Sequence, residues 1–167
     1  MLTQPVHILL VEDDDVDAEA VVRAFKKQKI NNPFTIVPDG IEALNALRGA
    51  GGQRRVPRPY LILLDINMPR MNGLEFLQQL RQDPMLRRSV VFVLTTSRRD
   101  EDIMSAYDEQ IAGYILKSKA GEHFTHLINM LDAYWRVVEF PVEMRLLEVP
   151  AAAPPGSMSG LMSEVTA

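Results

Sequence analysis

The chain has 167 residues, of which 47% are hydrophobic, so it can form one domain with a full core but not two domains of ordinary size. Its net charge of −4 argues against the basic surface of a nucleic-acid-binding protein and against a general attraction to anionic membranes. The sequence has no cysteine, which excludes disulfides, thiolate metal sites and cysteine nucleophiles. Because no signal peptide and no apolar stretch near the roughly 20 residues of a membrane span is present, we expect a cytoplasmic protein.

Five short apolar runs alternate with segments of helical periodicity along the chain. The apolar runs cover residues 6–11, 34–37, 60–64, 90–94 and 114–116. The helical patterns cover residues 18–25, 39–47, 73–82, 103–107 and 124–138. This alternation predicts an α/β fold, in which a doubly wound parallel sheet of five strands is covered by helices on both faces.

Polar residues near the start of two helical segments predict how those helices begin. Asp39 and Glu42 have the spacing of a capping box, which predicts the start of the second helix. Asp14, Asp15 and Asp17 form an acidic cluster, which we interpret as negative charge at the N-terminus of the first helix. The string DDDVD at residues 13–17 also imitates the start of a calcium-binding loop, but the glycine and glutamate that such a loop needs are missing.

Chemically active side chains follow four of the apolar runs, at the point where each run ends. Glu12 and Asp13 follow the first run, Asp65 the third, Thr95 the fourth and Lys117 the fifth. In a parallel sheet these positions share one edge, the carboxyl ends of the strands, where open α/β proteins bind their ligands. We therefore expect three carboxylates, one hydroxyl and one ammonium in a single shallow pocket.

The three expected carboxylates indicate a site for a divalent cation. Carboxylates that lie close together repel one another unless a cation intervenes, and hard oxygen ligands with room for water suit Mg²⁺. Asp65, ionised beside such a cation, can act as a nucleophile and become an aspartyl phosphate. Lys117 can then supply positive charge to the phosphoryl group, and Thr95 can supply a hydroxyl donor. The residues themselves thus predict a phosphoryl acceptor.

The strings LLVEDD, LLDINMPRMNG, VLTTS and GYILK resemble the motifs of response-regulator receiver domains, the phosphoacceptors of two-component signalling. They occur in the order and spacing of that family, and the resemblance extends over about residues 6–138. It implies a flavodoxin-like receiver fold with strand order 2-1-3-4-5 and five flanking helices. It also implies that Asp65 is phosphorylated.

The same resemblance implies roles for the residues around this aspartate. Mg²⁺ would be held by Asp13, Asp65 and the backbone carbonyl of Asn67. Glu12 would assist the metal through a water molecule.

Further implied roles fall on the last two strands. Thr95 and Lys117 would contact the phosphoryl group, and Tyr114 would be an aromatic switch that turns inward when Thr95 moves toward phosphate. Thr96 stands where a smaller residue is usual, so we expect it to narrow the access of a phosphodonor or water. Ser118 follows the lysine where most receivers have proline, and we expect this to alter how the last strand joins the last helix.

Within the family, the chain is most similar to the small stand-alone receivers that partner phytochromes, the red-light sensor histidine kinases of bacteria and cyanobacteria. The residues that carry this similarity are LTTSRRDED, Ser118 after the lysine, and AYW late in the last helix. The similarity implies a single-domain response regulator that accepts phosphate from such a kinase and signals through a changed surface. It would be a signalling protein and not an enzyme.

The residues beyond the last helix differ in pattern from the domain before them. We expect a receiver domain at 1–139, an extended amphipathic arm at 140–149 and a flexible low-complexity tail at 150–167. The arm alternates apolar and polar residues, which favours pairing with another chain, although it could instead fold back on its own domain.

Receivers usually associate through the fourth and fifth helices and the fifth strand, so we predict a homodimer there. The predicted interface residues are Ile103, Tyr107, Met130, Tyr134, Val137, Phe140 and Val142.

Three alternative functions differ in what they require of the sequence. The chain could be a phosphate sink or phosphorelay shuttle for a histidine kinase other than a phytochrome. A phosphatase of the haloacid-dehalogenase type needs a second aspartate where this chain has Asn67, and its nucleophile belongs to the first strand. A flavodoxin-like electron carrier needs a first turn rich in Ser, Thr and Gly, whereas the acidic EDDD here would repel a flavin phosphate.

Overall fold

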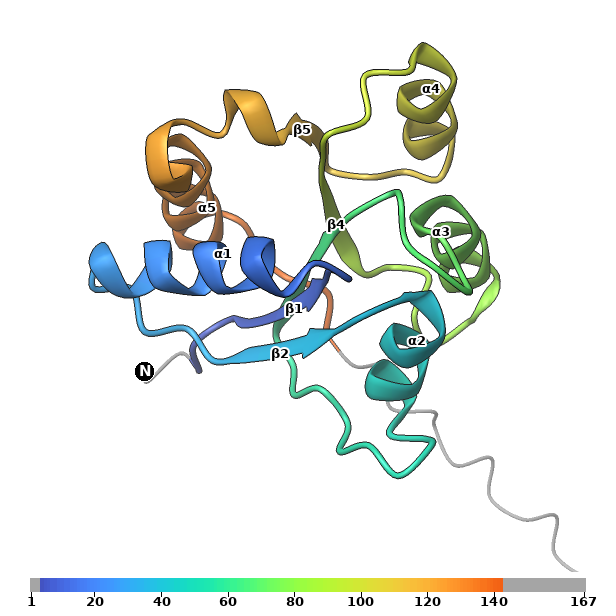
Figure 1. Cartoon of the computed structure of the whole chain (residues 1–167). Coiled ribbons are helices and arrows are strands. Elements are labelled where there is room, and N and C mark those ends of the chain that lie inside the picture. The colour runs from blue at the N-terminus through green and yellow to red at the C-terminus, as the bar shows by residue number, and fades with distance from the viewer. Residues whose placement is uncertain (1–3, 143–167) are drawn as a thin grey trace, which may run out of the picture.

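The computed structural model describes residues 4–142 as a central sheet with helices on both faces (Figure 1). The strands are β1 (His7–Val11), β2 (Phe34–Val37), β3 (Tyr60–Leu64), β4 (Val90–Thr95) and β5 (Gly113–Leu116). The helices are α1 (Asp15–Lys27), α2 (Gly40–Arg48), α3 (Gly73–Gln82), α4 (Asp100–Asp108) and α5 (Thr125–Val137), with two short 3-10 helices, η1 (Lys117–Lys119) and η2 (Glu122–Phe124). The predicted tail at 150–167 and most of the predicted arm at 140–149 lie outside the described residues.

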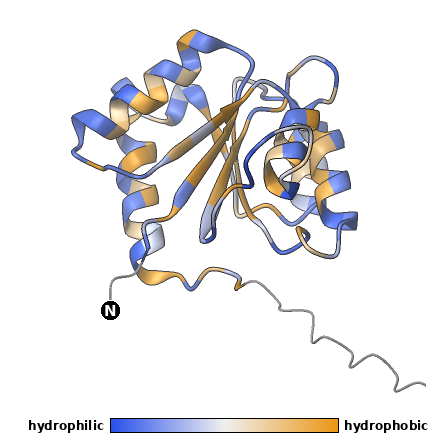
Figure 2. Cartoon of the chain, turned by 90° about the horizontal axis from the view of Figure 1, so that it is seen from below, coloured by the Kyte–Doolittle hydropathy of each residue, from blue (hydrophilic) through white to orange (hydrophobic). Residues whose placement is uncertain are grey.

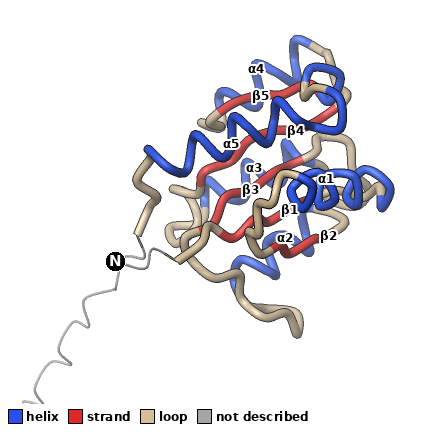
Figure 3. The backbone as a smooth tube through the Cα atoms, turned by 90° about the vertical axis from the view of Figure 1, so that its left-hand side faces the viewer, coloured by secondary structure: helices blue, strands red, loops and turns tan. Residues whose placement is uncertain are grey.

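The five strands form one parallel sheet in the order β2-β1-β3-β4-β5, which confirms the predicted fold (Figure 3). After β1 the chain adds β2 on one side, and it then returns to add β3 on the other side. The direction of winding therefore reverses between β1 and β3. In open α/β sheets a crevice forms at such a point, outside the carboxyl ends of the strands.

The central strand shows how the two faces of the sheet are covered. All five residues of β3 are buried, since the strand lies between two layers of helices. Leu61 and Leu63 pack in the hydrophobic cluster that includes residues of α1 and α5, whereas Ile62 and Leu64 pack in the cluster of α2 and α3. Figure 2 shows this arrangement as hydrophobic residues along the strands and on the inner faces of the helices. Within residues 4–142, no helix is long and apolar enough to span a membrane.

The start of α2 differs in part from the predicted capping box. The Asp39 carboxylate does accept a hydrogen bond from the backbone N–H of Glu42, at 3.0 Å. The Glu42 carboxylate, however, accepts hydrogen bonds from Arg70 and Gln53. The Glu42 carboxylate therefore joins α2 to the loops that carry Gln53 and Arg70, whose long side chains reach it in place of the N-cap backbone. The full reciprocal capping box lies at the start of α3.

The last helix begins later than its apolar pattern predicts. His123 and Phe124 have positive φ angles of 52° and 58°, which places them in the left-handed region, outside an α-helix. The chain first passes through η1 after Lys117 and then turns at Gly121, whose φ is 86°. Phe124 still packs against the core, which explains why its position fits the helical periodicity. The prediction that the helix includes this residue was wrong.

Candidate functional site

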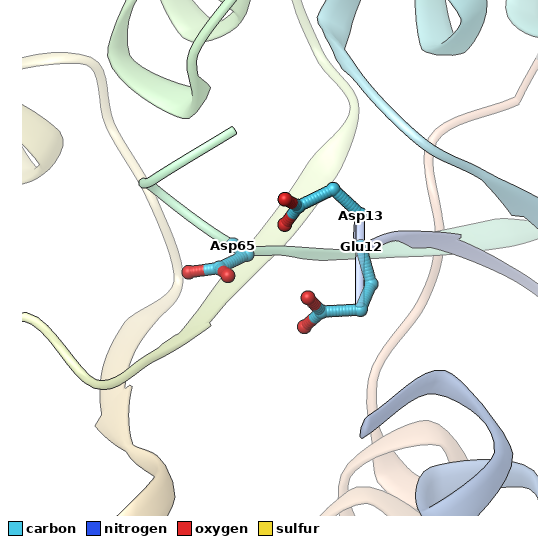
Figure 4. Close-up of side chains that lie close together, drawn as sticks. All are labelled: Glu12, Asp13 and Asp65. Atoms are coloured by element: carbon cyan, nitrogen blue, oxygen red, sulfur yellow. The ribbon is translucent and has the colours of Figure 1, made fainter. Parts of the chain in front are cut away.

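Three carboxylates meet at the carboxyl edge of the sheet, as predicted (Figure 4). Glu12 and Asp13 directly follow β1, and Asp65 directly follows β3. The topology brings them together because these two strands are neighbours, with Val11 paired with Leu64. Each residue offers a carboxylate oxygen, and these oxygens lie within 4.8 Å of one another. Glu12 and Asp65 are buried whereas Asp13 is exposed, so the cluster opens to solvent on one side.

The backbone around Asp65 is fixed by close packing. Its N–H donates to the Val11 carbonyl at 3.0 Å, which continues the strand pairing up to the site. The first residue of α3, Gly73, donates its N–H to the Ile66 carbonyl at 2.9 Å. A Cβ atom at Gly73 would lie 2.3 Å from the Asp65 carbonyl oxygen, a distance that no side chain can tolerate. Glycine is therefore required here for α3 to approach the strand end that carries Asp65.

The Lys117 ammonium reaches the same cluster from the end of β5. Its Nζ donates to Glu12 Oε2 at 2.8 Å and to Asp17 Oδ2 at 2.6 Å. A third carboxylate, that of Asp65, has its Oδ2 at 3.6 Å from Nζ, within ion-pair distance. The lysine therefore bridges three carboxylates that come from three different places in the chain. The sequence pattern indicates only a helix terminus at Asp17, and no local spacing indicates this contact.

Burial and charge act in opposite directions on the two most closely paired groups. Burial raises the pKa of Glu12 to about 6, although the hydrogen bond from Lys117 acts to lower it. Burial also acts to lower the pKa of Lys117. The hydrogen bonds from Lys117 to Asp17 and Glu12 and the charge of Asp65 outweigh burial, so the pKa of Lys117 is raised and the side chain stays protonated at neutral pH.

A hydrogen-bonded chain leads from the end of β4 to α4 and β5. Thr95 is fully buried, and its Oγ1 accepts a hydrogen bond from the Ser97 N–H at 3.2 Å. Ser97 Oγ donates to the buried carboxylate of Asp102 in α4 at 2.5 Å. The Tyr114 hydroxyl of β5 donates to the Ser97 carbonyl at 3.1 Å. Thr96, between these residues, is exposed at the rim of the site.

The loop that follows the phosphoacceptor candidate is held by an ion pair that sequence analysis did not find. Arg70 has a left-handed backbone, with φ of 63°, and donates through Nε to the buried Asp39 carboxylate at 2.7 Å. It also donates to Glu42 at 3.2 Å. These contacts join the β3–α3 loop to the start of α2. Asn67, which lies in this loop, is exposed.

The predicted interface residues divide into two groups. Tyr134 packs edge-on against Phe92 of its own core at a centroid distance of 5.1 Å, and Phe140 packs against Tyr134 at 6.2 Å. Phe140, the first residue of the predicted arm, thus lies on its own domain. Ile103 is half-buried. The large exposed residues of the predicted set are Tyr107, Met130, Val137 and Val142.

The donor set at the edge of the sheet fits a hard divalent cation. Glu12, Asp13 and Asp65 supply carboxylate oxygens, the ligands that Mg²⁺ prefers, and the exposed side of the cluster leaves room for water. Together with Asp17, the carboxylates outnumber the charge of Lys117, so the pocket retains negative charge that a metal ion would balance. Such a site has the parts needed for phosphoryl transfer to a carboxylate.

Comparison with known proteins agrees with this geometry. Residues 8–129 match the family model of the response regulator receiver domain. The chain is 35% identical over 131 residues to the response regulator Rcp1 of Synechocystis, an alignment that covers 78% of this chain and 89% of Rcp1. It is 36% identical over 132 residues to the probable methanogenesis regulatory protein FilR2 of Methanothrix harundinacea, covering 78% of this chain and 84% of that protein.

Solved structures with the same fold include phytochrome response regulators. The Mn²⁺-bound form of Rcp1 has a TM-score of 0.72 and 34% identity, with 83% of this chain and 100% of that chain covered. The phosphorylated cyanobacterial phytochrome response regulator RcpA has a TM-score of 0.75 and 32% identity, again with 83% and 100% covered. The bacteriophytochrome response regulator RtBRR has a TM-score of 0.65 and 33% identity, with 85% and 84% covered.

The sheet order, the carboxylates at its edge and the match over residues 8–129 all lead to one family. The chain is similar to Rcp1 in both sequence and structure. It belongs to the response regulator receiver domain family.

Proposed function

We propose that this protein is a single-domain response regulator that accepts a phosphoryl group from a sensor histidine kinase onto Asp65. The observation that carries the proposal is the position of this carboxylate, which lies at the open edge of the sheet beside two further acids and the Lys117 ammonium. In the transfer, the P–N bond of the kinase phosphohistidine breaks as a P–O bond forms to a carboxylate oxygen. The charge that spreads over the phosphoryl oxygens is matched by nearby positive charge.

Mg²⁺ is the metal proposed for this site. Asp13, Asp65 and the backbone carbonyl of Asn67 would hold it, with Glu12 assisting through water, and the ion would neutralise the charge of the acceptor and of the incoming phosphate. The chemistry of the carboxylate cluster supports this assignment, and so does the existence of a Mn²⁺-bound form of Rcp1. The raised pKa of Glu12, to about 6, indicates that an ionised Glu12 is costly without further positive charge.

The remaining site residues would act on the bound phosphoryl group or respond to it. Lys117 and Thr95 would contact its oxygens. Thr96, exposed at the rim, would restrict the approach of a phosphodonor or water. Tyr114 would respond when Thr95 moves, because its hydroxyl is bonded to the Ser97 carbonyl and the Ser97 N–H is bonded to Thr95.

A bacteriophytochrome is the kinase that we favour as phosphodonor. The sequence similarity of this chain to Rcp1 supports this choice, and so does its structural similarity to the phytochrome regulators RcpA and RtBRR. The runner-up is a role as phosphate sink or phosphorelay shuttle for a different histidine kinase. In either role the protein would work in the cytoplasm as a signalling component, its output a changed interaction surface.

We further propose that two copies associate through α4, β5 and α5. This face carries the large hydrophobic residues Tyr107, Met130 and Val137, which are exposed to solvent and not buried in the domain's own core. Such a contact would be symmetric, with the same patch contributed by both copies.

Asp65→Asn should abolish phosphorylation. Incubation of the full chain with radiolabelled, phosphorylated histidine kinases should label the wild type and leave this variant unlabelled, because an amide is not a nucleophile of this kind. Asp108→Asn, which removes a charge from the exposed end of α4, serves as control and should be labelled normally. Label that persists in Asp65→Asn would contradict the proposal. Faster transfer from another kinase than from a phytochrome would favour the runner-up.

Asp13→Asn should weaken Mg²⁺ binding by at least about tenfold, since it removes one of three clustered carboxylates. Isothermal titration with Mg²⁺ or Mn²⁺ provides the measurement. Asp15→Asn is the matched control, because it makes the same change of charge in the neighbouring turn but lies outside the cluster. Equal affinities for the two variants would argue that the metal binds elsewhere.

Val137→Glu should weaken self-association by at least about tenfold, because it places a charge within a proposed apolar contact. Sedimentation velocity should show the wild type as a dimer at tens of micromolar and this variant as a monomer. Val16→Glu is the control, as Val16 is similarly exposed, at 76% against 82% for Val137, but lies on α1. A monomeric wild type, with or without phosphate, would remove the dimer proposal.

A further inference from the structure

We infer that Asp17 is a positioning residue of the phosphorylation site, which restrains the Lys117 ammonium and limits how much of its charge reaches the phosphoryl group. The inference rests on the proposed function and extends it to the first turn of α1. In effect, a carboxylate of this helix would compete with the phosphorylated Asp65 for one lysine.

The distances show where the ammonium is now held. Nζ of Lys117 lies 2.6 Å from Asp17 Oδ2 but 3.6 Å from Asp65 Oδ2. The lysine side chain is 11% exposed and that of Asp17 is 39% exposed, so the pair is partly shielded from water and salt at its lysine end. Lys117 thus makes its shortest contact with a residue outside the three-carboxylate cluster.

The first turn of α1 fixes the carboxylate in this place. Asp14, the N-cap, accepts a hydrogen bond from the Asp17 N–H at 3.0 Å, and the Asp14 N–H itself donates to Glu12 Oε1 at 3.1 Å. Glu12 in turn accepts from Lys117 at 2.8 Å. The four residues therefore form a closed ring of hydrogen bonds. A ring of this kind holds Asp17 against the lysine through a helix start and not through a flexible loop.

The chemistry of the ammonium makes competition the expected result. A protonated lysine has three N–H donors, and two of them are used by Glu12 and Asp17. Phosphorylation of Asp65 would replace the single charge of its carboxylate by roughly −1.5 to −2 charges on the phosphoryl oxygens, by analogy with other phosphoresidues. The phosphoryl oxygens and Asp17 would then attract the same point charge. Loss of the Asp17 carboxylate frees this charge for the phosphoryl group.

Asp17 could instead act only as general negative charge at a helix N-terminus. The neighbouring Asp15 provides a control that distinguishes the two roles. Asp15 lies in the same first turn of α1 and is exposed. Among residues 4–142, its side chain makes no hydrogen bond and no ion pair, unlike that of Asp17. Asp15→Asn therefore removes equal charge from the turn without releasing the lysine.

The test is the affinity of the full chain for beryllofluoride, a phosphoryl mimic. This affinity is measured by NMR or calorimetric titration in saturating Mg²⁺. Asp17→Asn and Asp17→Ala should bind about threefold more tightly than the wild type, the effect of releasing one partly shielded ion pair. Asp17→Glu, which keeps the carboxylate, and Asp15→Asn should bind like the wild type. Thermal unfolding of each variant verifies that the fold is intact.

The outcomes separate this inference from the proposed function. Unchanged or weaker binding in both neutral Asp17 variants, with normal binding by the wild type, would overturn the inference alone. An equal gain in Asp15→Asn would assign the effect to net charge and would also overturn it. A wild type that does not bind beryllofluoride at all would overturn the proposed function, and the inference with it.

Discussion

The site depends on the bridging of clustered carboxylates by one ammonium at the edge of a parallel sheet. The order of the strands forces Glu12, Asp13 and Asp65 together, because β1 and β3 are neighbours and all strands point the same way. Without a cation these groups would repel one another and take up protons. Lys117 reaches them from β5 and supplies part of the balancing charge. The negative charge that remains makes the edge suitable for a divalent ion and, with it, for phosphate.

The same edge is connected to the face where we propose association. Thr95 is bonded to Ser97, and Ser97 is bonded both to Asp102 in α4 and to Tyr114 in β5. The Tyr107 hydroxyl of α4 also accepts from the Tyr114 N–H at 3.3 Å. A change at the phosphoryl group would therefore meet hydrogen-bonded side chains, of which Thr95, Ser97 and Asp102 are buried. This physical continuity supports a surface switch at α4 and β5.

The fold and the meeting of the three carboxylates at one edge were predictable from the sequence because both depend on local patterns. A strand covered on both faces must be a continuous apolar run, and in a parallel sheet the residue after each run lies at one edge. The missed contacts depend on long side chains that cross the fold. Asp17 is 100 positions from Lys117, and Arg70 is 31 from Asp39, so no local spacing indicates either pair. Phe124 has the periodicity of a helix but a left-handed backbone, because an apolar side chain can pack against the core in either backbone conformation.

The most direct test of the central claim is a crystal structure of the full chain with beryllofluoride and Mg²⁺. The account predicts beryllofluoride on the Asp65 carboxylate, Mg²⁺ among the clustered acids, and Nζ of Lys117 within hydrogen-bond distance of a fluorine, with its contact to Asp17 longer than 2.6 Å. An ammonium that still lies between Glu12 and Asp17, with beryllofluoride or metal bound at another place, would contradict the account.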